Sequence, residues 1–219
     1  MHFIDAWMEL GAGDLVRLLA PLLLLILSAF IPGQRIRQIT ALGVTALIPL
    51  LRELGAVPWL AAGWFVLWLV LGLWSPGDPE DTARRPLAKV GGMVETGTVG
   101  LALGLVLALL LIAAVARQDM SPEETRRASY GAALLALGIL HLMLRRHIRR
   151  AMIGFAAMGM GLQVLDGTAQ GAQIQAAPTS AAALLVATWL AVALALKVAV
   201  ARERYAGTGW VSDAHDLHD

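Results

Sequence analysis

Residues 142–165 read LMLRRHIRRAMIGFAAMGMGLQVL, and this stretch decides the fold. Two apolar segments of helical length approach each other here and are separated by four arginines, Arg145, Arg146, Arg149 and Arg150. Inserting one arginine at the centre of a bilayer costs about 2.5–3.5 kcal/mol, so four together cannot lie in hydrocarbon. We therefore predict two membrane-spanning helices joined by a turn at a membrane surface, and the positive-inside rule makes that surface cytoplasmic.

The composition of the chain is that of an integral membrane protein. Of its 219 residues, 58% are hydrophobic and 15% charged, and the mean hydropathy is +0.69. The 17 lysines and arginines stand at the ends of apolar runs and not in one patch, which excludes a nucleic-acid-binding surface. Because the chain has no cysteine, it offers no thiolate for an iron–sulfur cluster. Any electron transfer therefore belongs to a partner.

Apolar runs predict an all-α, polytopic membrane helix bundle with about seven transmembrane helices. The predicted spans are 15–31, 36–51, 56–74, 94–116, a fifth within a helix that starts at 122 before the membrane and continues to about 144, 149–165 and 180–200. The second run is the weakest because charged residues flank it and Pro49 lies inside it, and its alternative is a helix on the membrane surface. The fifth is the sharpest, since Ser121-Pro122-Glu123-Glu124 has the pattern of an N-cap, a first-turn proline and a capping-box glutamate.

The polar segments divide the chain into four parts. These are N-terminal membrane helices in 1–75, a polar linker in 76–93, C-terminal membrane helices in 94–201 and a cytoplasmic tail in 202–219. Residues 1–13 predict a short helix lying at the membrane interface. With seven spans, twelve lysines and arginines fall on the side of the Arg145–Arg150 turn and five on the opposite side. This asymmetry predicts an N-terminus outside and a C-terminus in the cytoplasm.

Glycines and tryptophans inside the apolar runs suggest how the helices pack. Gly100 and Gly104 form a GxxxG spacing that permits close helix approach, and Gly154 opens the glycine-rich run after the arginine turn. We assign all three to helix packing. Trp64 and Trp68 share one helix face. They have two interpretations, a cofactor or quinone site and ordinary packing against lipid or helices, of which packing is much the commoner.

A glycine-rich apolar helix that follows a tight arginine-rich turn resembles a known family. Arg145-Arg146-His147-Ile148 and Met152-Ile153-Gly154-Phe155 are similar to the K-type subunit of bacterial NADH:quinone oxidoreductase and the C subunit of multisubunit cation/proton antiporters. The length and the extra upstream spans are closer to component E of hydrogenase-4. The likeness to the K-type subunit is carried by about residues 128–201. It implies a helical subunit that packs between antiporter-like subunits of a bacterial inner-membrane complex.

The sequence departs from that family where the family carries intramembrane carboxylates. The K-type family has a glutamate two residues beyond the glycine that matches Gly154, where this chain has Ala156. The ionisable side chains that remain inside the predicted spans are Glu95, His141 and Lys197. They have two interpretations, the cytoplasmic mouth of an ion path completed by a neighbouring subunit, or ordinary groups. In the second, Lys197 snorkels, Glu95 lies at a helix N-terminus and His141 bonds a carbonyl or a neighbour.

These observations predict a non-catalytic integral membrane subunit of a multisubunit ion-translocating complex, within the bacterial cytoplasmic membrane. Its expected partners are antiporter-like subunits and the lipid bilayer. The alternatives are direct participation in proton or sodium translocation, and a stand-alone small transporter. An enzyme is disfavoured because the chain lacks a nucleophile, a metal cluster or paired carboxylates at catalytic spacing. We expect no catalytic residue, no cofactor and no metal site.

Overall fold

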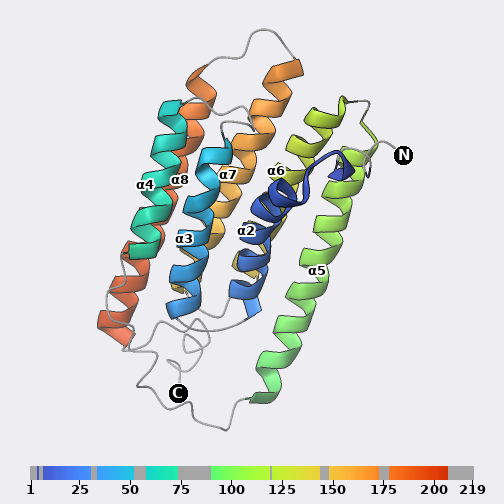
Figure 1. The fold of residues 1–219 in the computed structure, drawn as a ribbon. Coiled ribbons are helices and arrows are strands. Elements are labelled where there is room, and N and C mark those ends of the chain that lie inside the picture. The colour runs from blue at the N-terminus through green and yellow to red at the C-terminus, as the bar shows by residue number, and fades with distance from the viewer. Residues whose placement is uncertain are drawn as a thin grey trace.

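The chain is all-helical in the computed structural model, which describes residues 4, 7–30, 34–51, 58–73, 90–118, 120–143, 148–172 and 178–206. Figure 1 shows the arrangement of the helices. Seven helices lie within these ranges: α2 (Ala12–Phe30), α3 (Gln34–Leu51), α4 (Pro58–Leu73), α5 (Val90–Ala116), α6 (Pro122–Met143), α7 (Ile148–Ala172) and α8 (Pro178–Ala206).

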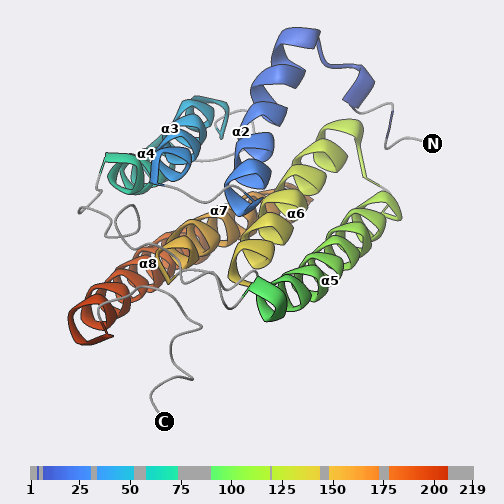
Figure 2. The ribbon, with the colours of Figure 1, turned by 90° about the horizontal axis from the view of Figure 1, so that it is seen from below.

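Successive helices run in alternating directions (Figure 1). The end of α2, the start of α3, the end of α4 and the start of α5 therefore lie at one end of the bundle, together with the end of α6, the start of α7 and the end of α8. We call this the arginine end, because residues 145–150 fall there in sequence. Viewed from that end, α5 lies at one edge of the bundle beside α6, and α3 and α4 lie side by side on the other flank (Figure 2).

The N-terminal and C-terminal helices share one hydrophobic core. Its members include Leu25 of α2, Trp64 and Trp68 of α4, Tyr130 of α6 and Met160 of α7, all fully buried. Small and weakly polar side chains are buried among them: Ser28, Thr40, Thr45, Ser129, Gln163, Thr168 and Thr188. The core thus combines tight aliphatic packing with hydroxyl groups, several of which bond backbone carbonyls of their own helix.

Large aliphatic side chains lie on the outside of the bundle. On α8, Val186, Leu190, Leu194 and Val198 form an outward stripe with 48–67% of each side chain exposed. Leu103, Leu105, Val106, Leu109 and Leu110 give α5 a similar outer surface. Exposed apolar surface on this scale is unfavourable in water and is typical of a surface that contacts a membrane or another protein.

Two helical segments are long and apolar enough to cross a membrane, Ala12–Ala29 and Ala181–Arg202. Two further apolar segments in the described part of the chain, Trp59–Leu73 and Ala102–Ala116, are shorter. Helix α3, the weakest predicted span, packs beside α2 and α4, and Thr40, Ala41 and Val44 are buried there.

Helices α6 and α7 make the most extensive contact in the bundle, and four glycines explain it. A Cβ atom added at Gly138 would lie 2.7 Å from the Gly154 carbonyl oxygen, and one at Gly161 would lie 2.7 Å from that of Gly131. The two pairs, Gly131 with Gly161 and Gly138 with Gly154, recur at the same interval along both antiparallel helices. The backbones therefore approach more closely than any side chain at these positions would permit.

Two predicted boundaries were wrong at the C-terminal helices. Helix α7 continues beyond the predicted span 149–165 to Ala172, and α8 continues beyond the predicted span 180–200 to Ala206, inside the predicted tail 202–219. The reason is that Thr168 is buried and donates a hydrogen bond to the Val164 carbonyl (2.8 Å), so the Gly/Thr/Gln run continues the packed face of α7. Helix α5 likewise begins at Val90, inside the predicted linker 76–93, most of which lies outside the described residues.

The predicted start of α6 is confirmed and has the full geometry of a capping box. The Glu124 carboxylate accepts hydrogen bonds from the Ser121 backbone N–H (3.0 Å) and the Ser121 hydroxyl (2.8 Å). The Glu124 backbone N–H donates in turn to Ser121 Oγ (3.3 Å). One turn along the exposed face, Arg127 forms an ion pair with Glu123. The first turn of α6 is therefore stabilised by its own side chains.

Loss of the Ser121 side chain is expected to loosen this helix end. We expect Ser121→Ala to destabilise the first turn of α6 by about 1 kcal/mol, because the Glu124 backbone N–H loses its acceptor. Hydrogen exchange at the amides of Glu124 and Thr125, measured in detergent micelles, should become several-fold faster. Ser129→Ala is the control within α6, since its hydroxyl donates only to the Arg126 carbonyl. Unchanged exchange in Ser121→Ala would contradict a stabilising capping box.

The same contacts give the helix end a pH dependence. Hydrogen bonds from the Ser121 side chain and backbone lower the pKa of Glu124 below its ordinary range. A carboxyl whose pKa is lower in the folded state stabilises that state above its unfolded pKa. This contribution is lost as the pH falls through the lowered folded pKa. We therefore expect exchange of the first-turn amides to rise, relative to the rest of α6, only below about pH 4.

Candidate functional site

The arginine turn, the leading sequence-predicted feature, falls largely outside the described residues. Arg145 and Arg146 lie outside them, and Arg149 and Arg150 belong to the first turn of α7 without described side chains. Glu95 is a residue of α5 whose side chain also lies outside the description. Their roles therefore remain predictions from the sequence.

His141 is the sequence-predicted ionisable residue that the fold buries. It lies in the last turn of α6 with 4% of its surface exposed, beside the last turn of α2. Its Nδ1 atom is 2.8 Å from the Leu137 carbonyl oxygen, and its Nε2 atom is 2.9 Å from the Ser28 hydroxyl. One ring nitrogen of His141 thus contacts a backbone carbonyl, and the other contacts a side chain of the neighbouring helix α2.

The hydrogen bonds around His141 can be completed in either protonation state. Because the Leu137 carbonyl only accepts, Nδ1 carries a proton and donates. In the neutral imidazole, Nε2 then accepts from the Ser28 hydroxyl. In the imidazolium, Nε2 donates to Ser28 Oγ, and the hydroxyl turns to the Leu25 carbonyl, 3.0 Å away. The two hydrogen-bond patterns therefore differ in the direction of one hydroxyl group.

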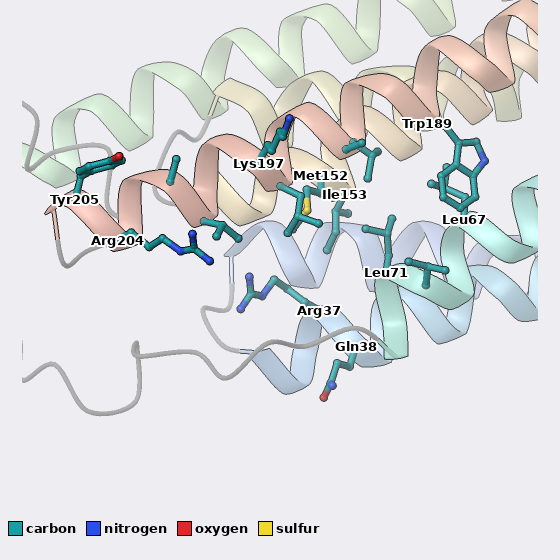
Figure 3. A pocket seen from close by; sticks show the side chains of 16 residues that line it. Arg37, Gln38, Leu67, Leu71, Met152, Ile153, Trp189, Lys197, Arg204 and Tyr205 are labelled. Atoms are coloured by element: carbon teal, nitrogen blue, oxygen red, sulfur yellow. The ribbon is translucent and has the colours of Figure 1, made fainter.

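Lys197 does not join His141. It lies on the exposed surface of α8 and lines a cavity between α3, α4, α7 and α8 at the arginine end (Figure 3). The predicted ion-path residues whose side chains are described are thus placed apart, one buried between α2 and α6 and one exposed on α8. The interpretation that Lys197 snorkels towards the membrane surface stays a prediction.

Trp64 and Trp68 are core residues of the bundle. Both are fully buried, and neither indole N–H has a hydrogen-bond partner in the described part of the chain. Tyr130 Oη and Gln163 Oε1 are buried in the same way. Neither tryptophan is exposed on the outside of the bundle or lines the cavity, so helix packing accounts for both.

The predicted packing glycines lie at two crossings. Gly104 of α5 faces α6, where an added Cβ would collide with Leu140, and Gly154 of α7 faces Gly138 of α6. The surroundings of Gly100 lie outside the described part of the structure. Among the described residues, no group of three or more His, Asp or Glu side chains gathers that could hold a metal ion.

Comparison of the chain with family models, with curated proteins and with solved structures gave no match. The resemblance of residues 128–201 to the K-type subunit is therefore based only on the arginine turn and the glycine-rich helix after it, and it stays a prediction.

Sequence reasoning missed two features. It did not pair Ser28 with His141, which are far apart in the chain and meet only through the packing of α2 on α6. It also missed the cavity that Arg37 and Arg204 line together. In both cases the sequence offered a weak signal, namely a polar or charged side chain at the edge of an apolar run.

Proposed function

We propose that this chain is a multi-pass subunit of the bacterial inner membrane that packs beside antiporter-like subunits of a multisubunit ion-translocating complex. The observation that carries the membrane placement is the distribution of side chains between inside and outside. Large aliphatic groups lie outward on α2, α4, α5 and α8, whereas hydroxyl and amide side chains are buried. In lipid this distribution is favourable, because tails solvate the outer faces and several buried hydroxyl groups bond backbone carbonyls of their own helix.

The alternating directions of the helices support the proposed orientation. They bring the start of α3, the start of α7 and the end of α8 to the arginine end. Most of the lysines and arginines lie near these termini in sequence. A cytoplasmic arginine end satisfies the positive-inside rule and leaves the N-terminus on the opposite side.

A role in packing, without chemistry of its own, is supported by the side chains in the described interior. No carboxylate is buried there, and His141 is the one basic side chain buried among the described residues. A path that moves ions alone would need a series of ionisable or hydrated groups across the bundle. The proposed assembly with antiporter-like subunits comes from the resemblance of residues 128–201.

Purification of the natural complex in a mild detergent tests this function. We expect the chain to be extracted only with detergent and to co-purify with large antiporter-like membrane subunits. Arg145→Gln/Arg146→Gln should reduce the recovered complex about thirty-fold, since each basic group near an anionic surface contributes about 1 kcal/mol. Arg17→Gln/Arg117→Gln removes the same charge from the opposite end and should leave recovery unchanged. Recovery of the wild-type chain without partners would refute the proposal.

One observation favours the second candidate, direct participation in proton transfer: the buried His141 imidazole contacts the Ser28 hydroxyl, and the hydrogen bonds of this pair can be formed with the imidazole neutral or protonated. Pumping into vesicles by the assembled complex separates the two functions. For a packing subunit, Glu95→Gln and His141→Gln should assemble normally and pump at nearly the wild-type rate. Ser28→Ala is the matched control, because it removes the hydroxyl and keeps the imidazole. A pumping defect in a variant that assembles normally would place this subunit on the ion path.

A further inference from the structure

A cavity of about 580 Å³ opens between α3, α4, α7 and α8 at the arginine end (Figure 3). Most of its wall is aliphatic or aromatic, with Leu67 and Leu71 from α4, Ile153 from α7, and Trp189 and Val192 from α8. The bundle therefore leaves an apolar cleft where four helices meet.

The cleft is long enough for a lipid chain. Its lining extends along α8 from Trp189 to Arg204, which corresponds to about 22 Å at about 1.5 Å per residue. One leaflet contributes about half of the 30 Å hydrocarbon core, or about 15 Å. The cleft thus matches the depth of one leaflet with its headgroup region.

Positive charge is concentrated at the end of the cleft that faces the arginine end. Arg37 lies in the first turns of α3 and Arg204 in the last turn of α8. Their guanidinium groups turn into the space between the two helices from opposite sides (Figure 3). Lys197 is a third basic residue of the wall, and none of the described lining residues is acidic. Guanidinium groups bind phosphate through paired, charge-assisted hydrogen bonds.

We propose that this cleft binds an anionic phospholipid of the cytoplasmic leaflet. The phosphate lies between Arg37 and Arg204, and one acyl chain runs along α8 towards Trp189. Charge complementarity at the mouth and the apolar depth behind it select a molecule with an anionic head and a long chain. Basic pockets between membrane helices on the cytoplasmic side recognise such headgroups. The assignment rests on the membrane placement proposed above and not on any partner subunit.

Native mass spectrometry of the detergent-purified chain tests the headgroup site, with phosphatidylglycerol as the anionic probe and phosphatidylcholine as the zwitterionic one. We expect retention of phosphatidylglycerol in preference to phosphatidylcholine. Arg37→Gln/Arg204→Gln should weaken phosphatidylglycerol binding about thirty-fold, which corresponds to about 1 kcal/mol for each arginine. Arg17→Gln/Arg202→Gln is the matched control, because neither residue lines the cleft. Equal loss in both double variants, or equal binding of both lipids, would overturn the proposal.

Variants in the apolar part of the cleft distinguish binding of a lipid from binding of a free anion. Ala193 lines the cleft, and Ala193→Phe should fill it and weaken phosphatidylglycerol binding without changing charge. Leu194→Phe adds bulk on the neighbouring outward position and should have no effect. If millimolar inorganic phosphate displaced the lipid, and Ala193→Phe bound phosphatidylglycerol as tightly as the wild type, the cleft would be an anion site and the lipid proposal would be overturned. A chain that is recovered in water without detergent would instead refute the membrane placement itself.

Discussion

Gly138→Leu is expected to destabilise the bundle by about 3 kcal/mol or more and to separate α6 from α7. A Cβ atom at Gly138 would lie 2.6 Å from the Met158 backbone nitrogen and 2.7 Å from the Gly154 carbonyl oxygen. Because both atoms belong to the backbone, no side-chain rotation relieves the clash, and the helices must move apart. Overpacking typically costs 1–3 kcal/mol, and a clash with backbone belongs at the upper end of that range.

Unfolding by sodium dodecyl sulfate in mixed micelles, followed by circular dichroism, measures this effect. Gly161→Leu should behave like Gly138→Leu, because its added Cβ would lie 2.6 Å from the Leu135 backbone nitrogen. Gly13→Leu is the matched control, since no atom lies within 4 Å of an added Cβ at Gly13. Wild-type stability in Gly138→Leu would show that α6 and α7 do not cross at these glycines.

Trp68→Ala is expected to reduce the free energy of unfolding by about 3–5 kcal/mol, the range for deleting a large buried aromatic side chain. Trp68 has no exposed surface, and its indole N–H has no hydrogen-bond partner among the described residues. Trp68→Phe keeps most of the apolar volume and removes a buried donor that lacks an acceptor. It should therefore stay within about 1.5 kcal/mol of the wild type.

The exposed Trp59 on the same helix provides the control, because 52% of its surface is accessible and less of its side chain is buried than that of Trp68. Trp59→Ala should change the free energy of unfolding by less than about 1 kcal/mol. The comparison also bears on function. If Trp68→Phe destabilised the bundle as severely as Trp68→Ala, the indole N–H would have a role that volume does not explain, and a ligand or water at Trp68 would have to be sought.

Local features of the chain were largely predictable. The start of α6 followed from Ser121 and Glu124, because a capping box involves only residues within one turn. Approximate bounds of all seven helices followed from the apolar runs, since a helix satisfies its own backbone hydrogen bonds. The end of α7 was predicted too early because Gly, Thr and Gln were interpreted as the end of the helix, whereas Thr168 in this run is buried and the run is helical.

The candidate site could be predicted only in part. His141 was recognised as an ionisable residue inside an apolar run, which depends on its own side chain alone. Its partner Ser28 could not be identified, because a serine near the end of one apolar run shows no preference for any particular helix. The same holds for Arg37 and Arg204, which reach one cleft from helices that are distant in sequence.

The sequence by itself determined that the chain is helical and where most of its helices begin and end, because those properties depend on periodicity, capping and the transfer energy of single residues. Only the tertiary structure decided which faces meet. Glycine at four positions permits close approach, but reciprocal pairing of Gly131 with Gly161 and Gly138 with Gly154 fixes the crossing of α6 on α7. Which helix packs against which depends on the fit between surfaces that are far apart in the chain, and this fit cannot be read from any local sequence pattern.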